Sequence, residues 1–186
     1  MTALPPAVRL VLKLILFAYL SWILFYLATR YTPELPGFRP PWPIVVIDLI
    51  NLFIHEAGHL FFKIFGEFLH ILGGSLFQVL LPLALAIVTL RQTPQFAAYP
   101  LFWVGESMVN VSPYIRDADQ MKLRLIAKGL KHDWAVLLHG NLQMAAPLAD
   151  IVLYAGVALC AFALGMGIAY AIRTFREDQI PRTDPG

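Results

Sequence analysis

The chain has 186 residues, of which 59% are hydrophobic and 14% are charged. A typical soluble domain carries about 25% charged residues, so this composition indicates an integral membrane protein and excludes an ordinary soluble domain. The net charge of +2 gives no indication of a nucleic-acid partner. The single cysteine, Cys160, excludes a disulfide framework and a cysteine-rich zinc site.

Apolar stretches long enough to cross a bilayer follow one another along the chain. We expect the first span over about residues 10–29. We interpret it as an uncleaved helix, because no small-residue cleavage site follows its apolar run. A proline-rich loop over residues 30–43 ends this helix, and the second span then covers about residues 44–65.

The second span contains the sequence HEAGH at residues 55–59, which matches the H-E-x-x-H motif of zinc peptidases. Histidines four residues apart share one face of a helix, so His55 and His59 can bind the same Zn²⁺. Glu56 points about 100° away from His55. This direction suits a general base that takes a proton from the zinc-bound water.

Two further polar residues, Asp48 and Asn51, lie on the same face of this span as the histidines. Ionisable groups inside a membrane are costly and face the bundle interior. Asp48 is too far from His55 to share the metal. We therefore expect Asp48 and Asn51 to orient neighbouring groups or water around the site, with a simple polar contact between helices as the alternative.

A tight turn leads to the third span over about residues 71–90. His70 stands at its start, where an interfacial histidine is favoured over a metal ligand. The fourth span covers about residues 95–114 and carries Glu106 and Asn110 four residues apart. A glutamate inside a span needs a cation, a metal or a proton, so Glu106 is a candidate zinc ligand. We expect the polar faces of the second and fourth spans to pack together.

These motifs resemble the site-2 protease family of intramembrane zinc metalloproteases, in which a later span carries an Asn-x-x-Pro stretch ending in Leu-Asp-Gly. In the middle third of this chain, Asn110 and Pro113 match that stretch. Asp117 comes one residue early and Asp119 one late, and no Leu-Asp-Gly follows. The resemblance implies that Asp117 is the third zinc ligand. Glu106, from its place inside a span, is the second choice and Asp133 the third, and Asn110 could bind substrate backbone.

A polar segment over residues 116–146 follows, and its basic residues place it in the cytoplasm by the positive-inside rule. Residues 121–130 are amphipathic and are expected to lie on the membrane surface. In the sequence His132-Asp133-Trp134, with His139 further on, Asp133 or His132 could complete the zinc shell. The alternative is a helix capped at Asp133. A fifth span covers about residues 147–172, before a polar tail over 173–186.

The sequence therefore predicts one integral-membrane domain over residues 1–172, an all-α bundle of about five spans with an amphipathic cytoplasmic segment. The predicted function is a zinc metalloendopeptidase that cleaves membrane-associated proteins or peptides. It is placed in the bacterial inner membrane with a cytoplasmic N-terminus. The alternative is a non-catalytic membrane protein that holds zinc for a structural or transport role, and Glu56 distinguishes the two because only hydrolysis needs it.

Overall fold

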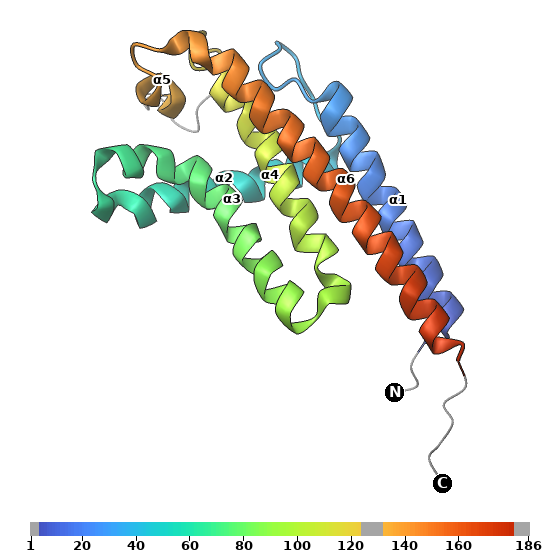
Figure 1. Cartoon of the computed structure of the whole chain (residues 1–186). Helices are drawn as coiled ribbons and strands as arrows, with labels where there is room; N and C mark the ends of the chain where they lie inside the picture. Colours follow the sequence, from blue (N-terminus) through green and yellow to red (C-terminus); the bar gives the residue numbers. More distant parts are fainter. Residues whose placement is uncertain (1–3, 124–131, 181–186) are drawn as a thin grey trace.

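The computed structural model describes residues 4–123 and 132–180, and every regular element in these two ranges is a helix (Figure 1). The elements are α1 (Pro6–Arg30), α2 (Trp42–Phe62), the 3-10 turn η1 (Lys63–Phe65), α3 (Glu67–Gln92), the 3-10 turn η2 (Pro94–Phe96), α4 (Ala98–Arg116), α5 (Asp133–Leu137), the 3-10 turn η3 (Leu142–Met144) and α6 (Ala145–Asp178). The expected all-α bundle is confirmed.

In the part of the chain that the structure describes, four helices are long and apolar enough to cross a membrane, which indicates a membrane protein. They are α1, α2 continued by η1, α3, and α6 preceded by η3. The expected fourth span corresponds to α4, which is not among these four. Its polar residues lower its hydropathy, but 11 of its 19 residues are buried, so they face other helices. The fifth expected span is longer than predicted, because α6 continues to Asp178.

Helices α1, α4 and α6 form the core of the bundle, in which Phe17, Phe102 and Leu164 pack together with their neighbours. Glycines allow α4 and α6 to approach closely. A Cβ atom added to Gly105 would lie 2.6 Å from the carbonyl oxygen of Gly156, and one added to Gly156 would lie 2.6 Å from the carbonyl oxygen of Gly105. Small residues at such crossings are typical of membrane helices.

Helix α2 and the first part of α3 form a hairpin that extends sideways from this bundle (Figure 1). Gly66, with φ 97°, makes the turn between them. The hairpin is closely packed, because a Cβ atom on Gly73 would lie 2.8 Å from the carbonyl oxygen of Gly58. α3 then changes direction and runs along α4. The pair Gly73–Gly74 and Pro82, which has no N–H to donate, both permit such a bend.

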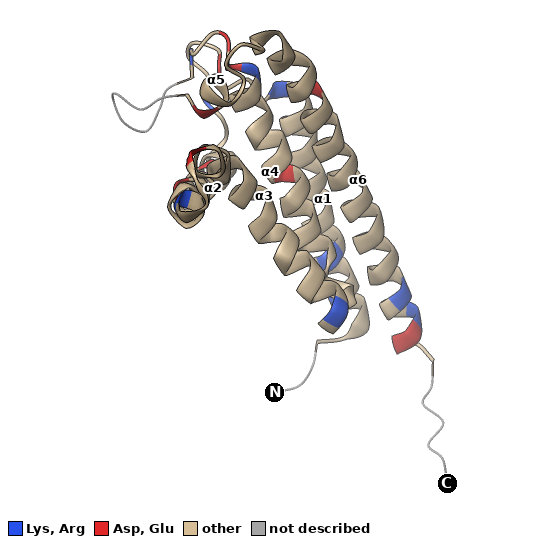
Figure 2. Cartoon of the chain, turned by 60° about the vertical axis from the view of Figure 1, so that its left-hand side comes forward, with Lys and Arg blue, Asp and Glu red and all other residues tan. Residues whose placement is uncertain are grey.

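The bundle has two charged ends (Figure 2). At one end Arg9, in the first turns of α1, pairs with Asp178 at 3.0 Å. At the other end Arg116 pairs with Asp150. From Asp150 to Asp178 α6 rises about 42 Å at 1.5 Å per residue, which exceeds the hydrocarbon core of about 30 Å.

The start of α1 and the end of α4 therefore lie at opposite ends of the bundle. The expected cytoplasmic position of both the N-terminus and the basic segment stays a prediction. Part of the expected amphipathic segment, residues 124–130, lies outside the described residues. The described part, residues 121–123, is not helical.

Candidate metal centre

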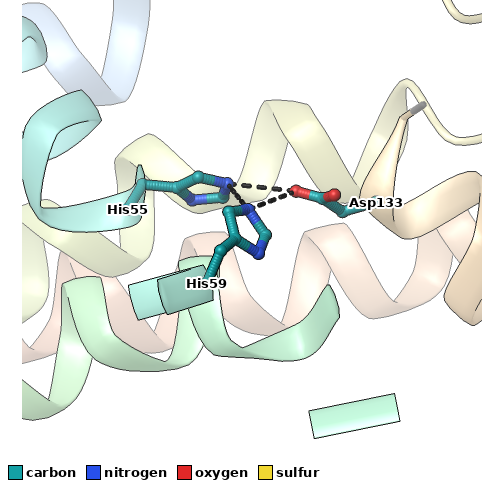
Figure 3. Close-up of side chains that lie close together, drawn as sticks. All are labelled: His55, His59 and Asp133. Atoms are coloured by element: carbon teal, nitrogen blue, oxygen red, sulfur yellow. Dashed lines mark hydrogen bonds and ion pairs between the residues drawn. The ribbon is translucent and has the colours of Figure 1, made fainter. Parts of the chain in front are cut away.

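Three potential ligand atoms converge at the base of the α2–α3 hairpin (Figure 3). His55 Nε2 and His59 Nε2 lie 3.1 Å apart, and the Oδ2 atom of Asp133 lies 3.0 Å from the first and 3.2 Å from the second. In a tetrahedral zinc site with bonds of 2.0–2.1 Å, ligand atoms are about 3.3 Å apart. The triangle therefore fits one face of such a site after movements of a few tenths of an ångström.

His70 fixes the ring of His59. The Nδ1–H of His59 donates to the carbonyl oxygen of His70 at 2.8 Å, and the Nδ1–H of His70 donates back to the carbonyl oxygen of His59 at 2.8 Å. Because Nδ1 keeps its proton, a neutral His59 would offer its lone pair to a metal at Nε2, the atom that faces the triangle. Without a metal, Nε2 carries a proton when it donates to the Asp133 carboxylate. The sequence suggested an interfacial histidine here. In the structure, His70 instead orients a candidate metal ligand.

Gly74 provides the space in which a metal ion would sit. It is buried on α3 directly against the two imidazoles. A Cβ atom on Gly74 would lie 2.5 Å from His55 Nε2 and 2.6 Å from His59 Nε2. Only a residue without a side chain leaves this position open. The HEAGH motif gives no indication of this role for Gly74.

Asp133 reaches the histidines from α5, a helix of only five residues that is too short to be stable by itself. Contacts on both sides hold it in place. The Nε1–H of Trp134 donates to the hydroxyl of Ser75 on α3 at 3.0 Å. On the other side, His132 Nδ1 lies 3.4 Å from Oδ2 of Asp117. These contacts tie α5 to both α3 and α4.

Asp117, the expected third ligand, has a different role. Its side chain is 3% exposed at the end of α4. Oδ1 accepts the backbone N–H of Lys122 at 2.8 Å, and Oδ2 accepts that of Leu123 at 2.9 Å. Both oxygens are therefore used to fold the chain after α4, and the structure brings Asp133, not Asp117, to the two histidines. His139 is exposed and lies outside this group.

The second-choice ligand, Glu106, also lies elsewhere, in a buried network between α2 and α4. Asn51 donates its amide to the Glu106 carboxylate at 2.9 Å, and Asn110 donates its amide to Oδ1 of Asp48 at 2.8 Å. Each helix thus supplies one carboxylate and one amide to the other. The expected packing of the two polar faces is observed. Asn110, expected to bind substrate, is occupied inside the bundle.

The charge of the candidate centre suits a metal ion. Burial raises the pKa of Asp133, but hydrogen bonds to His55 and His59 outweigh burial and lower this pKa to about 2. The carboxylate is therefore ionised at neutral pH, as metal binding requires. His55 is 12% exposed and His59 16%, so the site is shielded but open to small molecules.

Glu56 is the remaining residue of the motif. It is half-buried on α2 and forms no hydrogen bond or ion pair with residues in the described ranges 4–123 and 132–180. Its carboxylate is therefore unoccupied by other side chains of the described residues. The ring of Tyr114 stacks on His55, with ring centres 6.1 Å apart, and limits the movement of that ligand.

Comparison of the chain with family models, with curated proteins and with solved structures gave no match. Any function assigned to the chain therefore depends on the motif and on the geometry of the candidate centre.

Proposed function

We propose that the chain is a membrane-embedded zinc metallopeptidase in which His55, His59 and Asp133 bind one Zn²⁺. The observation that carries this proposal is the triangle of ligand atoms, 3.0–3.2 Å apart, beside the space left by Gly74. Two imidazoles and one carboxylate are a typical catalytic zinc set, which leaves a fourth position open to water.

Glu56 would take a proton from water as the water oxygen attacks the peptide carbonyl carbon, and would pass it to the leaving amine as the C–N bond breaks. Zinc, when bound, would lower the pKa of the water toward about 7 and polarise the peptide carbonyl. The offset of Glu56 from the two histidines, and the lack of a hydrogen-bond or ion-pair partner for it among the described residues, support this role. The substrates are membrane-associated proteins or peptides, whose helices must unwind before a backbone carbonyl becomes reachable.

The bacterial inner membrane is the proposed location. Eight Lys and Arg residues belong to the segments toward the metal centre, five of them over residues 116–131. Six belong to the segments toward the termini: Arg9, Lys13, Arg91, Arg173, Arg176 and Arg182. By the positive-inside rule this difference favours a cytoplasmic position for the end of the bundle that holds the metal centre. The N-terminus would then lie on the other side.

A second candidate function is non-catalytic zinc binding, for a structural or transport role, with the same three ligands. It is favoured by the shielding of the centre, since His55 and His59 are each less than one-fifth exposed. The two functions differ in their need for Glu56, because a structural site requires no general base.

The test is the variant Glu56→Gln, which keeps the shape of the side chain but cannot accept a proton. We expect zinc to stay bound and the rate of cleavage to fall by about 10²- to 10⁴-fold. The measurement is quantitative proteomics of membrane proteins in cells that carry the variant or the wild type, with uncleaved substrates accumulating in the variant.

Glu67→Gln is the matched control, since Glu67 is an exposed glutamate at the start of α3. It should leave both zinc content and substrate levels unchanged. If no membrane protein accumulates with Glu56→Gln, while His55→Ala cells differ from wild type, the zinc site matters without hydrolysis and the non-catalytic function stands.

A further inference from the structure

The metal-binding motif lies on a helix that packs across the bundle. Among the described residues, four side-chain contacts join α2 to α4: Asp48 to Asn110, Asn51 to both Trp103 and Glu106, and the stacked rings of His55 and Tyr114. Along α2 these positions rise steadily, but on α4 they fall from 110 to 103 and 106 and then rise to 114. Two helices running side by side would give a steady order on both.

The figures show the same arrangement. In Figure 2 α2 and the first part of α3 are seen along their axes, whereas α1, the rest of α3, α4 and α6 are seen from the side. In Figure 1 α2 runs from the loop after α1 toward α5 without descending to the end where the termini lie. Both ends of α2 are therefore close to one end of the bundle, the end that carries Asp133.

The helices α1, α3, α4 and α6 are long enough to cross the bilayer. The part of α3 from Gly74 to Gln92 rises about 27 Å, and the 19 residues of α4 rise about 28 Å, each close to the hydrocarbon core of about 30 Å. α4 is polar for a span, but its polar residues bond to other helices and not to lipid. The ion pair between Arg9 and Asp178 requires the ends of α1 and α6 to be on the same side, which means an even number of crossings.

The tip of the α2–α3 hairpin presents a large apolar surface. Its members are 55% to 83% exposed: Leu60, Phe61, Ile64, Phe65 and Phe68. Lys63 and Glu67 are exposed beside them. An apolar surface with charged residues at its edge, extending sideways from helices that cross a bilayer, fits the boundary between headgroups and acyl chains.

We propose that α2 does not cross the membrane, and that the α2–α3 hairpin is immersed in the lipid layer at the face that carries Asp133. The chain crosses four times, through α1, α3, α4 and α6, and both termini lie at the opposite face. The metal centre is then at the membrane boundary. A ligand or peptide reaches it from that face, at the point where a membrane segment emerges from the lipid. This topology holds whether or not the centre is catalytic.

Single cysteines test the topology in intact and inverted membrane vesicles. They are introduced at the exposed positions Leu35, Gln92, Asn141 and Gln179 in a Cys160→Ala background, and labelled with a membrane-impermeant maleimide. Four crossings predict that positions 35 and 141 label from one side, and positions 92 and 179 from the other.

If α2 also crosses, positions 35 and 179 label from the same side and position 141 from the opposite side, and the proposal is overturned. Zinc binding is not needed for this labelling. The result is therefore independent of whether the metallopeptidase proposal is correct.

The lipid contact is tested with a fluorescent bimane label on Ile64→Cys, in the same background, reconstituted with spin-labelled lipids. We expect the strongest quenching by spin labels near the headgroups. Stronger quenching by labels at the bilayer centre would show that the hairpin reaches across the membrane. Absence of quenching by any lipid would show that another protein or a second copy of the chain covers the tip. Either result would contradict the proposal.

Discussion

Position 74 shows how much the candidate centre depends on one side chain. A Cβ atom added to the buried Gly74 would lie 2.5 Å from His55 Nε2 and 2.6 Å from His59 Nε2, so only a glycine leaves room beside the two rings. The spacing in HEAGH was enough to predict that His55 and His59 share a face of one helix. The motif does not indicate that the residue facing them on α3 is a glycine.

Replacing this glycine should close the centre. In Gly74→Ala the added Cβ would lie 2.5 Å and 2.6 Å from the two Nε2 atoms, so the rings must move apart or zinc is excluded. We expect zinc affinity to fall by about 100-fold or more. Titration of the purified protein against a zinc chelator measures this.

Gly165→Ala is the matched control, because no atom lies within 4 Å of the Cβ that it would add to α6. It should bind zinc as the wild type does. If Gly74→Ala also retains full affinity, the ion does not occupy the space beside α3, and the assigned position of the centre is wrong.

The third ligand depends on the elements that hold α5. Two side chains beside Asp133 hold α5 in place. His132 contacts Asp117, which directly follows α4, and Trp134 donates a hydrogen bond to Ser75 on α3. Sequence reasoning ranked Asp133 behind Asp117 and Glu106 because nothing local fixes where a five-residue helix will pack. A polar face on each of α2 and α4, by contrast, was enough to predict their contact, since buried polar groups need partners.

Asp117→Asn should weaken zinc binding without removing a ligand. The amide nitrogen cannot accept the N–H of Lys122 or Leu123, so the chain between α4 and α5 loses part of its support. We expect zinc affinity to fall by about 10- to 100-fold. The visible spectrum of the Co²⁺-loaded protein at saturation should keep its wild-type shape, because the three ligands are unchanged.

Asp119→Asn makes the same chemical change at an exposed position two residues further on, and it should have no effect on affinity. A different Co²⁺ spectrum for Asp117→Asn would mean that Asp117 binds the metal directly. Unchanged affinity would mean that its contact with His132 does not position Asp133.

For the molecule as a whole, apolar runs predicted the all-α membrane bundle and most helix boundaries to within a few residues. Those runs contain no information on the direction of a helix. α2 is as apolar as a span and lies across the bundle, whereas α4 is more polar and runs along it. α4 can run along the bundle because its polar groups form hydrogen bonds with α2 and α3. These contacts are seen only in the tertiary structure.

The orientation of the chain in the membrane stays a prediction. Counting each apolar run as a crossing places the N-terminus and the basic segment on one side. In the structure Arg9 pairs with Asp178 at one end of α6 and Arg116 pairs with Asp150 at the other, so this expectation depends on whether α2 crosses.

The most direct test of the central claim is the zinc content of the protein purified in detergent from zinc-supplemented cells. Two imidazoles and the carboxylate of Asp133 predict about one zinc ion per chain in the wild type. The double variant His55→Ala/His59→Ala should contain none, while a thermal unfolding scan shows that it remains folded. Full zinc retention in the double variant, or a wild-type protein without zinc, would contradict the assignment of the metal centre.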